Sequence, residues 1–430
     1  QAMLAEKGAR SKNHPNSFTD IPSLDFELFG VSVAHARYFL RRGDFASDIS
    51  VTDLPERFYE YLLILERTGE LAVTMDDLPV IARKHSKTWL ESRIDRDLSQ
   101  TYGHVNDAET LMLSGVYRSG TTILAQLVGA HRDVYLTYDS IKYPRFCLDL
   151  EVGMSGRVVV EDIAGRITER WGIKFDVEKV IKTLPDSPSH AEIYERSLSH
   201  LRDNYKPAAQ IYGEKIAVMW TSTPDFLEMF PKGKVIHIFR DPRDVVASFK
   251  NMTYEPGFAY LDAAFNCLHA MSALKDIQAY YGQDRVMLIR LEDLTEDPEA
   301  TARKISEFLQ REFDSGMVNP ECYRDKVGNP WKNNSGFFPK SEGIMKNQER
   351  WREHLSKAEI FFIEMISMSK MVEYGYELSG AVPSRTEWDE IHSYIEDPVL
   401  SKRFKLWIAS GKGVEGYPSN PRDKEVRHKS

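Results

Sequence analysis

The sequence is short of the residues that build several common kinds of site. Its 430 residues include three cysteines, which are Cys147, Cys267 and Cys322, and no two of them stand close together. A zinc knuckle and a redox-active C-x-x-C pair are therefore excluded. We expect three separate thiols in a reducing compartment.

Long apolar runs and an excess of positive charge are also missing. No stretch reaches the roughly 18 apolar residues that a membrane-spanning helix needs, and no secretory signal is recognisable. The net charge is −9 and the pI is about 5.8, which argues against a general nucleic-acid or heparin surface. We expect a cytoplasmic protein with no nucleic-acid partner and no membrane span. The sequence begins at Gln1. We therefore keep the alternative that a membrane anchor has been removed from it.

The hydrophobic content and the order of strand and helix patterns predict one large α/β domain with additions at both ends. A hydrophobic share of 42% is enough for a sizeable core. Strand and helix patterns alternate over residues 109–378, which predicts a mostly parallel sheet with helices on both faces. Residues 1–20 are expected to be disordered or tag-derived. Residues 21–108 form a helical extension that packs on the core or caps an acceptor site, and residues 379–430 form a C-terminal helical extension.

The most informative segment combines a buried strand, a polar loop and the start of an amphipathic helix. Leu111–Val116 is the predicted strand, and the helix follows at Thr121. Such a loop holds phosphate through backbone N–H groups and the positive end of the helix dipole. The spacing Gly115-x4-Gly120-Thr-Thr is close to the nucleotide P-loop, but the P-loop lysine is missing. A cation stands earlier instead, at Arg118.

A second segment repeats this layout. Residues 235–239 are branched and aromatic, as expected for a buried parallel strand. Asp241 is a plausible N-cap, with Pro242 at the first helical position. Arg240 lies at the carboxyl end of the strand, and Ser248 lies about two helical turns further on. Two such elements place two anion sites at the carboxyl edge of one sheet, where open α/β sheets bind ligands.

This pairing resembles the sulfotransferase family, in its bacterial type, over about residues 111–378. The resemblance implies a P-loop-like sulfotransferase fold and the donor 3′-phosphoadenosine 5′-phosphosulfate (PAPS), with no metal required. It assigns Arg240 and Ser248 to the 3′-phosphate. The segment Tyr374–Tyr376 resembles a strand-like end of bacterial members. The 5′-phosphosulfate loop that it implies consists of Arg118, Ser119, Gly120, Thr121 and Thr122.

Two carboxylates compete for the role of general base. Asp139 lies 21 residues after Arg118, and in tyrosylprotein sulfotransferases, which this loop resembles, a glutamate at that offset is the base. Glu214 is the rival. Lys215 resembles a family lysine that stabilises the bridging oxygen. The Glu214-Lys215 pair also fits a simple surface ion pair.

A polar loop over residues 328–336 is a third candidate for donor binding. Trp331 fits stacking on adenine and Lys332 fits a phosphate contact, as in late family loops that close over the nucleotide; an ordinary surface loop is the alternative. His131 and His237 are expected to be core histidines. Arg243 and Asp244 are expected to form structural ion pairs.

These observations predict an enzyme that moves a sulfuryl group from PAPS to a hydroxyl or amine and releases adenosine 3′,5′-bisphosphate. The modest pI favours a small-molecule acceptor over a polyanion. The alternatives are a degenerate P-loop kinase, against which the missing lysine counts, and a catalytically inactive nucleotide-binding scaffold. The acceptor's identity and the oligomeric state are not readable from the sequence.

Overall fold

The computed structural model describes most of the chain between residues 101 and 398. The described ranges are 101–153, 155–217, 219–251, 257–325, 327–331, 349–380 and 384–398, with single positions 82, 84, 87, 90–92, 400, 402 and 406. The predicted segment 1–20 and nearly all of the extension 21–108 lie outside the described residues, as does most of the chain after residue 398.

The chain divides into two compact units, which are described separately. The sheet unit consists of Thr88–Arg240 and Ala273–Glu349. The helical unit consists of Gln1–Lys87, Asp241–Ser272 and Arg350–Ser430. The boundaries predicted at residues 109 and 378 stay predictions.

A five-stranded sheet forms the centre of the sheet unit, and all of its pairings are parallel. The strand order is β2-β3-β1-β4-β5, which places β1 in the middle. The expected mostly parallel α/β fold is thereby confirmed. The strands are β1 (Thr110–Gly115), β2 (Val134–Tyr138), β3 (Ile211–Lys215), β4 (Lys234–Phe239) and β5 (Val286–Arg290).

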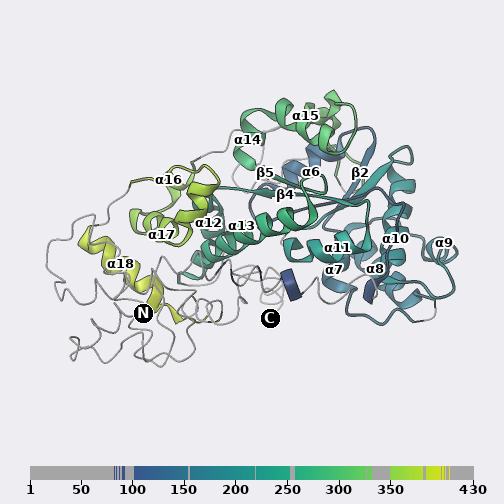
Figure 1. Cartoon of the computed structure of the whole chain (residues 1–430), viewed down its shortest axis with the longest axis horizontal. Coiled ribbons are helices and arrows are strands. Elements are labelled where there is room, and N and C mark those ends of the chain that lie inside the picture. Colours follow the sequence, from purple (N-terminus) through teal and green to yellow (C-terminus); the bar gives the residue numbers. More distant parts are fainter. Residues whose placement is uncertain are drawn as a thin grey trace. The chain divides into compact units, whose positions relative to one another are not determined.

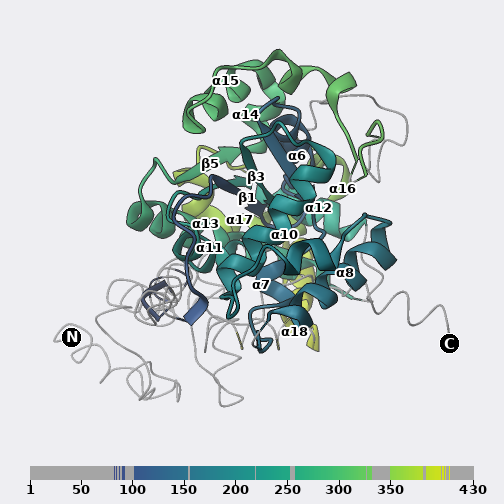
Figure 2. The same cartoon turned by 90° about the vertical axis from the view of Figure 1, so that its right-hand side faces the viewer.

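Helices cover the sheet on both sides, with α14 and α15 at the top of both views and α7, α8 and α10 lower (Figure 1, Figure 2). The α-helices of this unit are α6 (Thr121–Gly129), α7 (Tyr143–Phe146), α8 (Arg157–Trp171), α9 (Val177–Ile181), α10 (His190–Tyr205), α11 (Thr223–Met229), α14 (Leu291–Glu296) and α15 (Pro298–Phe308). Short 3₁₀ helices are η3 (Met219–Ser222), η5 (Ser315–Val318) and η6 (Pro320–Cys322).

The core on the α6 side follows from the two-residue period of the strands. Leu111 and Leu113 of β1, with Ile236 and Ile238 of β4, pack in one apolar cluster with α6 and α15 residues. The residues between them point to the other face. On that face His237 is buried and shares a hydrogen bond of 2.9 Å with Thr223 of α11.

The strand order creates a switch point beside β1. The chain leaves β1 towards β2 on one side and leaves β4 towards β5 on the other. Connections that diverge in this way open a crevice at the carboxyl ends of the two strands, where α/β sheets bind ligands. Gly115 pairs with Ile238 here, so the loop after β1 and the residue after β4 leave the sheet side by side.

The helical unit is held by a buried ion-pair network. Arg243 bonds the carboxylate of Asp241 and donates to Glu364 at 2.6 Å, and its guanidinium lies 4.1 Å from the centre of the Trp351 ring. The Asp244 carboxylate accepts a hydrogen bond from the backbone N–H of Trp351 at 3.0 Å. The structural ion pair expected at Arg243 is therefore confirmed. The helices are α12 (Pro242–Lys250), η4 (Ala259–Leu261), α13 (Asp262–Tyr281, which continues into the sheet unit), α16 (Trp351–His354), α17 (Lys357–Glu373) and α18 (Arg385–Glu396).

One local expectation needs correction. Tyr374–Tyr376 is not strand-like: it forms the turn that ends α17, with Gly375 in the left-handed region at a φ of 77°. The segment around Glu214 is a full strand, β3, although Gly213 at its centre weakens the strand pattern. Among the described residues, no helix combines the length and apolar character needed to cross a membrane.

Candidate active site

The loop between β1 and α6 has the backbone shape of an anion cradle. Gly120 is the N-cap of α6 and lies in the left-handed region at a φ of 95°, so it offers no side-chain acceptor to the first turn. Arg118 also has a positive φ, of 65°. Ser119 is buried, and its hydroxyl donates to the Val116 carbonyl at 2.6 Å. The loop therefore turns sharply and leads into the positive end of the helix dipole.

Close packing holds this loop against β4 and α14. A Cβ on Gly115 would lie 2.2 Å from the Ile238 carbonyl oxygen, and one on Gly120 would lie 2.5 Å from Leu291 Cδ1. Both positions thus require glycine for steric reasons. Thr121 is buried and Thr122 half-buried in the first turn of α6.

Arg240 lies against this loop, across the switch point. It follows β4 directly and is 7% exposed. Its Nη1 donates to the Arg118 carbonyl oxygen at 3.3 Å. The structure therefore brings together two candidate residues that are 122 positions apart. Ser248, the expected partner of Arg240, is buried in α12 of the helical unit.

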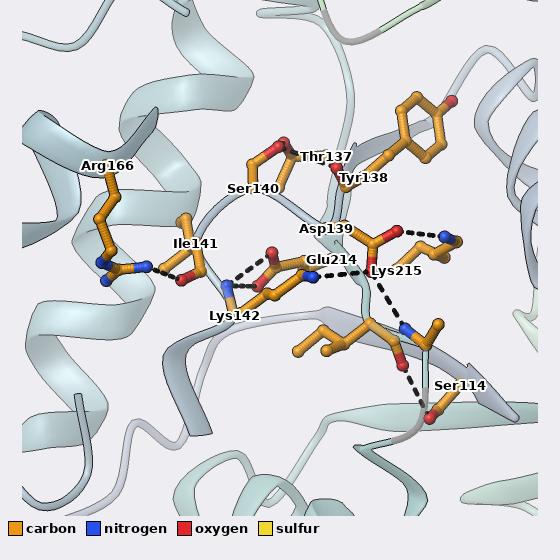
Figure 3. Close-up of polar contacts among 12 residues, drawn as sticks. Ser114, Thr137, Tyr138, Asp139, Ser140, Ile141, Lys142, Arg166, Glu214 and Lys215 are labelled. Atoms are coloured by element: carbon orange, nitrogen blue, oxygen red, sulfur yellow. Dashed lines mark hydrogen bonds and ion pairs between the residues drawn. The ribbon is translucent and has the colours of Figure 1, made fainter. Parts of the chain in front are cut away.

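A second cluster lies at the carboxyl ends of β2 and β3 (Figure 3). Tyr138 pairs with Lys215 in the sheet, so Asp139, the next residue, ends beside Lys215. The Asp139 carboxylate forms an ion pair with the Lys215 ammonium and lies 3.8 Å from Lys142 Nζ. It also accepts from the Ala217 N–H at 3.2 Å. The Asp139 side chain is 22% exposed, which leaves it open to a small reactant.

Glu214 has a different environment, although it stands next to Lys215 in β3. It is fully buried. Its two carboxylate oxygens accept from the Lys142 N–H at 2.8 and 3.0 Å, and one of them accepts from the Tyr194 hydroxyl at 3.2 Å. The alternative of a surface ion pair is wrong for Glu214, because the carboxylate bonds backbone and tyrosine inside the fold.

The pKa values of the two carboxyl groups move in opposite directions. Burial raises the pKa of Glu214 to about 7, and the nearby charge of Asp139 adds to this, while the Lys142 N–H opposes it. Burial also acts to raise the pKa of Asp139, but the ammonium groups of Lys215 and Lys142 outweigh it and hold that pKa below its usual value. Asp139 is thus ionised at neutral pH, as a proton acceptor must be.

The remaining predicted residues lie apart from these clusters or outside the description. The backbone N–H of Trp331 donates a hydrogen bond to the Tyr323 carbonyl at 3.0 Å. The rings of these two residues meet edge to face, with centroids 6.1 Å apart. Lys332 lies outside the described residues. His131 is buried, with Nε2 bonded to the Glu312 carbonyl at 3.0 Å. Burial lowers the pKa of His237 to about 3, so both expected core histidines are confirmed.

Sequence reasoning missed three residues of the second cluster, namely Lys142, Arg166 and Tyr194. One signal for Lys142 is local: it precedes Tyr143-Pro144, a pattern that marks a helix start. Nothing in the local sequence of α8 or α10 indicates that Arg166 reaches the Ile141 carbonyl or that Tyr194 reaches Glu214 of β3. Among the described residues, no group of three or more His, Cys, Asp or Glu side chains is arranged to hold a metal ion.

Comparison with known proteins agrees with this layout. Residues 111–315 match the model of the sulfotransferase family. A protein-tyrosine sulfotransferase of Drosophila melanogaster is 24% identical over 241 residues, which are 55% of this chain and 45% of the fly protein. The chain spans less than half the length of the curated relatives that it matches.

Several solved structures that are similar to the chain are also named sulfotransferases. The sulfotransferase domain of the Synechococcus PCC 7002 olefin synthase is 19% identical and covers 64% of this chain and 97% of that domain, with a TM-score of 0.42. A mouse sulfotransferase solved with PAP is 14% identical and covers 64% of this chain and 89% of that one, with a TM-score of 0.35. Residues 111–315, the part of the chain that matches the sulfotransferase family model, contain both clusters described above.

Proposed function

We propose that this protein transfers a sulfuryl group from PAPS to a hydroxyl or amine of a small-molecule acceptor and releases adenosine 3′,5′-bisphosphate. The observation that carries the proposal is the approach of Arg240 to the Arg118 carbonyl across the β1–β4 switch point. It puts two cations and a helix N-terminus at one edge of the sheet, which suits a donor with two anionic groups.

In this proposal the donor lies along that edge. The backbone N–H groups of residues 118–122 and the Arg118 guanidinium hold the 5′-phosphosulfate. Arg240 and Ser248 hold the 3′-phosphate, and the Trp331-Lys332 segment contributes stacking and a further cation. Because PAPS carries a good leaving group, cations and N–H donors can stabilise the developing charge without a metal.

The chemical step is assigned to the Asp139 cluster. The acceptor oxygen or nitrogen attacks sulfur, and its proton passes to the Asp139 carboxylate. The bond between sulfur and the bridging oxygen breaks, so adenosine 3′,5′-bisphosphate leaves with the electron pair. Lys215 stabilises the negative charge that develops on this oxygen. The ion pair with Lys215 lowers the pKa of Asp139, so this carboxylate is ionised before the acceptor binds.

Binding measured by calorimetry without Mg²⁺ tests the donor. We expect adenosine 3′,5′-bisphosphate to bind at least about tenfold more tightly than ATP, and Arg240→Ala to remove most of that affinity through the lost charge-assisted contacts. Arg303→Ala, at an exposed arginine of α15 paired with Glu299, is the matched control. Equal affinity for the two nucleotides, or an unchanged affinity in Arg240→Ala, contradicts the proposal and favours the kinase or scaffold alternative.

A turnover assay with PAPS then tests the acceptor. Phenols, alcohols and amines are compared with tyrosine-containing peptides, since the fly relative is named a protein-tyrosine sulfotransferase. We expect small acceptors to be sulfated at the higher kcat/KM. Donor binding without turnover on any of these acceptors supports the inactive-scaffold alternative.

A further inference from the structure

The turn that carries Asp139 is conformationally strained. Asp139 has a φ of 51°, and Lys142, three residues later, has a φ of 50° and a ψ of 47°. Neither is glycine: aspartate adopts the left-handed region fairly readily, but for a lysine such as Lys142 this backbone conformation is unfavourable. Strain of this kind persists only where the surroundings hold the backbone in place, and it concentrates at functional sites.

Four residues of this turn, 139–142, are each fixed by a hydrogen bond (Figure 3). The Asp139 N–H donates to the Lys215 carbonyl at 2.8 Å and so prolongs the β2–β3 ladder by one residue. The Ser140 hydroxyl donates to the Tyr138 carbonyl at 3.1 Å. At the far end, Arg166 Nη1 donates to the Ile141 carbonyl at 2.5 Å, and the Lys142 N–H donates to Glu214.

Glu214 has no surface through which an acceptor could reach it. Its exposure is 0%, and its oxygens are occupied by the Lys142 N–H and the Tyr194 hydroxyl. A general base must come within hydrogen-bond distance of the proton that it removes. The position of Glu214 therefore suits a role in holding the turn and does not suit direct contact with the acceptor.

The support behind Glu214 is itself rigid. The Tyr194 ring stacks on Tyr143 with centroids 4.5 Å apart, and the Tyr143 hydroxyl shares a hydrogen bond of 2.9 Å with His190 Nδ1. These three residues are buried and join α7 to α10. A carboxylate anchored in this way can impose an unfavourable backbone conformation on Lys142.

We propose that Glu214 is a positioning residue that holds the 139–142 turn in its strained form, and that Arg166 assists it from α8. The strained turn presents the Asp139 carboxylate to the acceptor and the Lys142 ammonium beside it. This inference rests on the proposed function, since it takes Asp139 as the base. It goes further in removing Glu214 from the chemical step and in adding Arg166, Tyr194 and Lys142 to the site.

Three variants separate a positioning role from a basic one. In Glu214→Ala we expect kcat to fall about 10- to 100-fold, because a displacement of about 1 Å costs up to that much, with the Kd for adenosine 3′,5′-bisphosphate unchanged. In Glu214→Gln the amide oxygen can still accept from the Lys142 N–H, so most of the lost activity returns. Asp139→Asn keeps the shape of the side chain but cannot take a proton, so kcat stays low.

Hydrogen exchange of a peptide that spans residues 139–147 gives a readout that does not depend on activity. We expect its amides to exchange at least about tenfold faster in Glu214→Ala than in the wild type, and at the wild-type rate in Glu214→Gln. If Glu214→Gln loses as much kcat as Asp139→Asn while exchange is unchanged, Glu214 takes part in the chemistry and the inference is wrong. Unchanged exchange in Glu214→Ala also overturns it.

Failure of the proposed function is recognised separately. It shows as a wild-type protein that does not bind adenosine 3′,5′-bisphosphate, whatever the exchange rates of the turn. Circular dichroism of each variant checks that it is folded. If Glu214→Ala does not fold, Arg166→Lys replaces it, and faster exchange of residues 139–147 than in the wild type is then the supporting result; an unchanged rate overturns the assignment.

Discussion

Asp139 and Glu214 illustrate how neighbouring carboxyl groups acquire different roles from their surroundings. Asp139 faces two lysine ammonium groups, which lower its pKa, and remains partly exposed. Glu214 is enclosed, and burial raises its pKa to about 7. Paired groups whose pKa values are driven apart commonly divide the tasks of a site. Here the division is between a group that can accept a proton and a group that shapes the backbone.

At this scale the first prediction concerns the base. Asp139→Asn should lower kcat about 10²- to 10⁴-fold, the usual contribution of a general base. The Kd for adenosine 3′,5′-bisphosphate should change less than about twofold, because Asp139 lies at β2 and not at the loop after β1. Steady-state kinetics with PAPS and calorimetry check the two values. Glu299→Gln, at an exposed ion pair of α15, is the control, and equal kcat values in both variants would rule out Asp139 as the base.

At the scale of elements, the loop between β1 and α6 depends on Gly120. Gly120→Ala places a Cβ 2.5 Å from Leu291 Cδ1 at a φ of 95°, so we expect a loss of about 1–2 kcal/mol in the free energy of unfolding. Donor affinity should fall about tenfold, since the loop N–H groups are displaced. Urea unfolding and calorimetry measure these effects.

The matched control for this loop is Gly165→Ala in α8. A Cβ on Gly165 meets no atom within 4 Å, and alanine favours the helix by about 0.5–1 kcal/mol. This variant should therefore be as stable as the wild type or more stable, with unchanged donor affinity. A stable Gly120→Ala protein with full affinity would show that the loop tolerates a side chain.

In the helical unit, Arg243 joins the start of α12 to α17. Arg243→Met leaves Asp241 and Glu364 buried without this partner, and breaking a buried ion pair from one side costs about 3–5 kcal/mol. Arg352→Met removes a more exposed arginine from the same Trp351 ring and should cost no more than about 1 kcal/mol. Urea unfolding compares the two. Equal losses would show that the ring contact, and not the buried ion pair, dominates.

The elements were predictable where the signal is local. The strands at residues 111–116 and 235–239 and the helices that follow them lie within one or two residues of the observed bounds. The pairing of β2 with β3 could not be predicted from the sequence, because the two strands are distant in the chain and no local pattern encodes which strands meet. Asp139 and Lys215 were therefore found as separate candidates, and their ion pair emerged only from the register of Tyr138 with Lys215.

For the whole molecule, the buried Glu214 makes stability depend on pH. Its pKa is about 7 in the folded state against 4.5 as the reference value, so the folded state binds the extra proton between these pH values. The contribution of Glu214 to the free energy of unfolding is fully present below pH 4.5. As pH rises through about 7, this contribution falls by about 3 kcal/mol. The charges that face it are Asp139 and Lys142, with the Tyr194 hydroxyl beside them.

Urea unfolding of the wild type and of Glu214→Gln between pH 5 and pH 8 isolates this contribution. The wild type should lose stability relative to the variant as pH rises, since glutamine does not titrate and the other groups are shared. Parallel curves for the two proteins would mean that Glu214 does not titrate in this range.

The central place of β1 also governs the order in which the chain can assemble on the ribosome. β1 is made before the other strands, yet Thr110 pairs with Tyr212 and Leu111 with Lys234. Its apolar residues must therefore wait, unpaired, until most of the sheet unit has been synthesised. Parallel sheets with such distant pairings fold slowly and expose aggregation-prone surface meanwhile. We therefore expect the nascent chain, whose central strand β1 is the first of this sheet to be made, to depend on chaperones until β3 and β4 are complete.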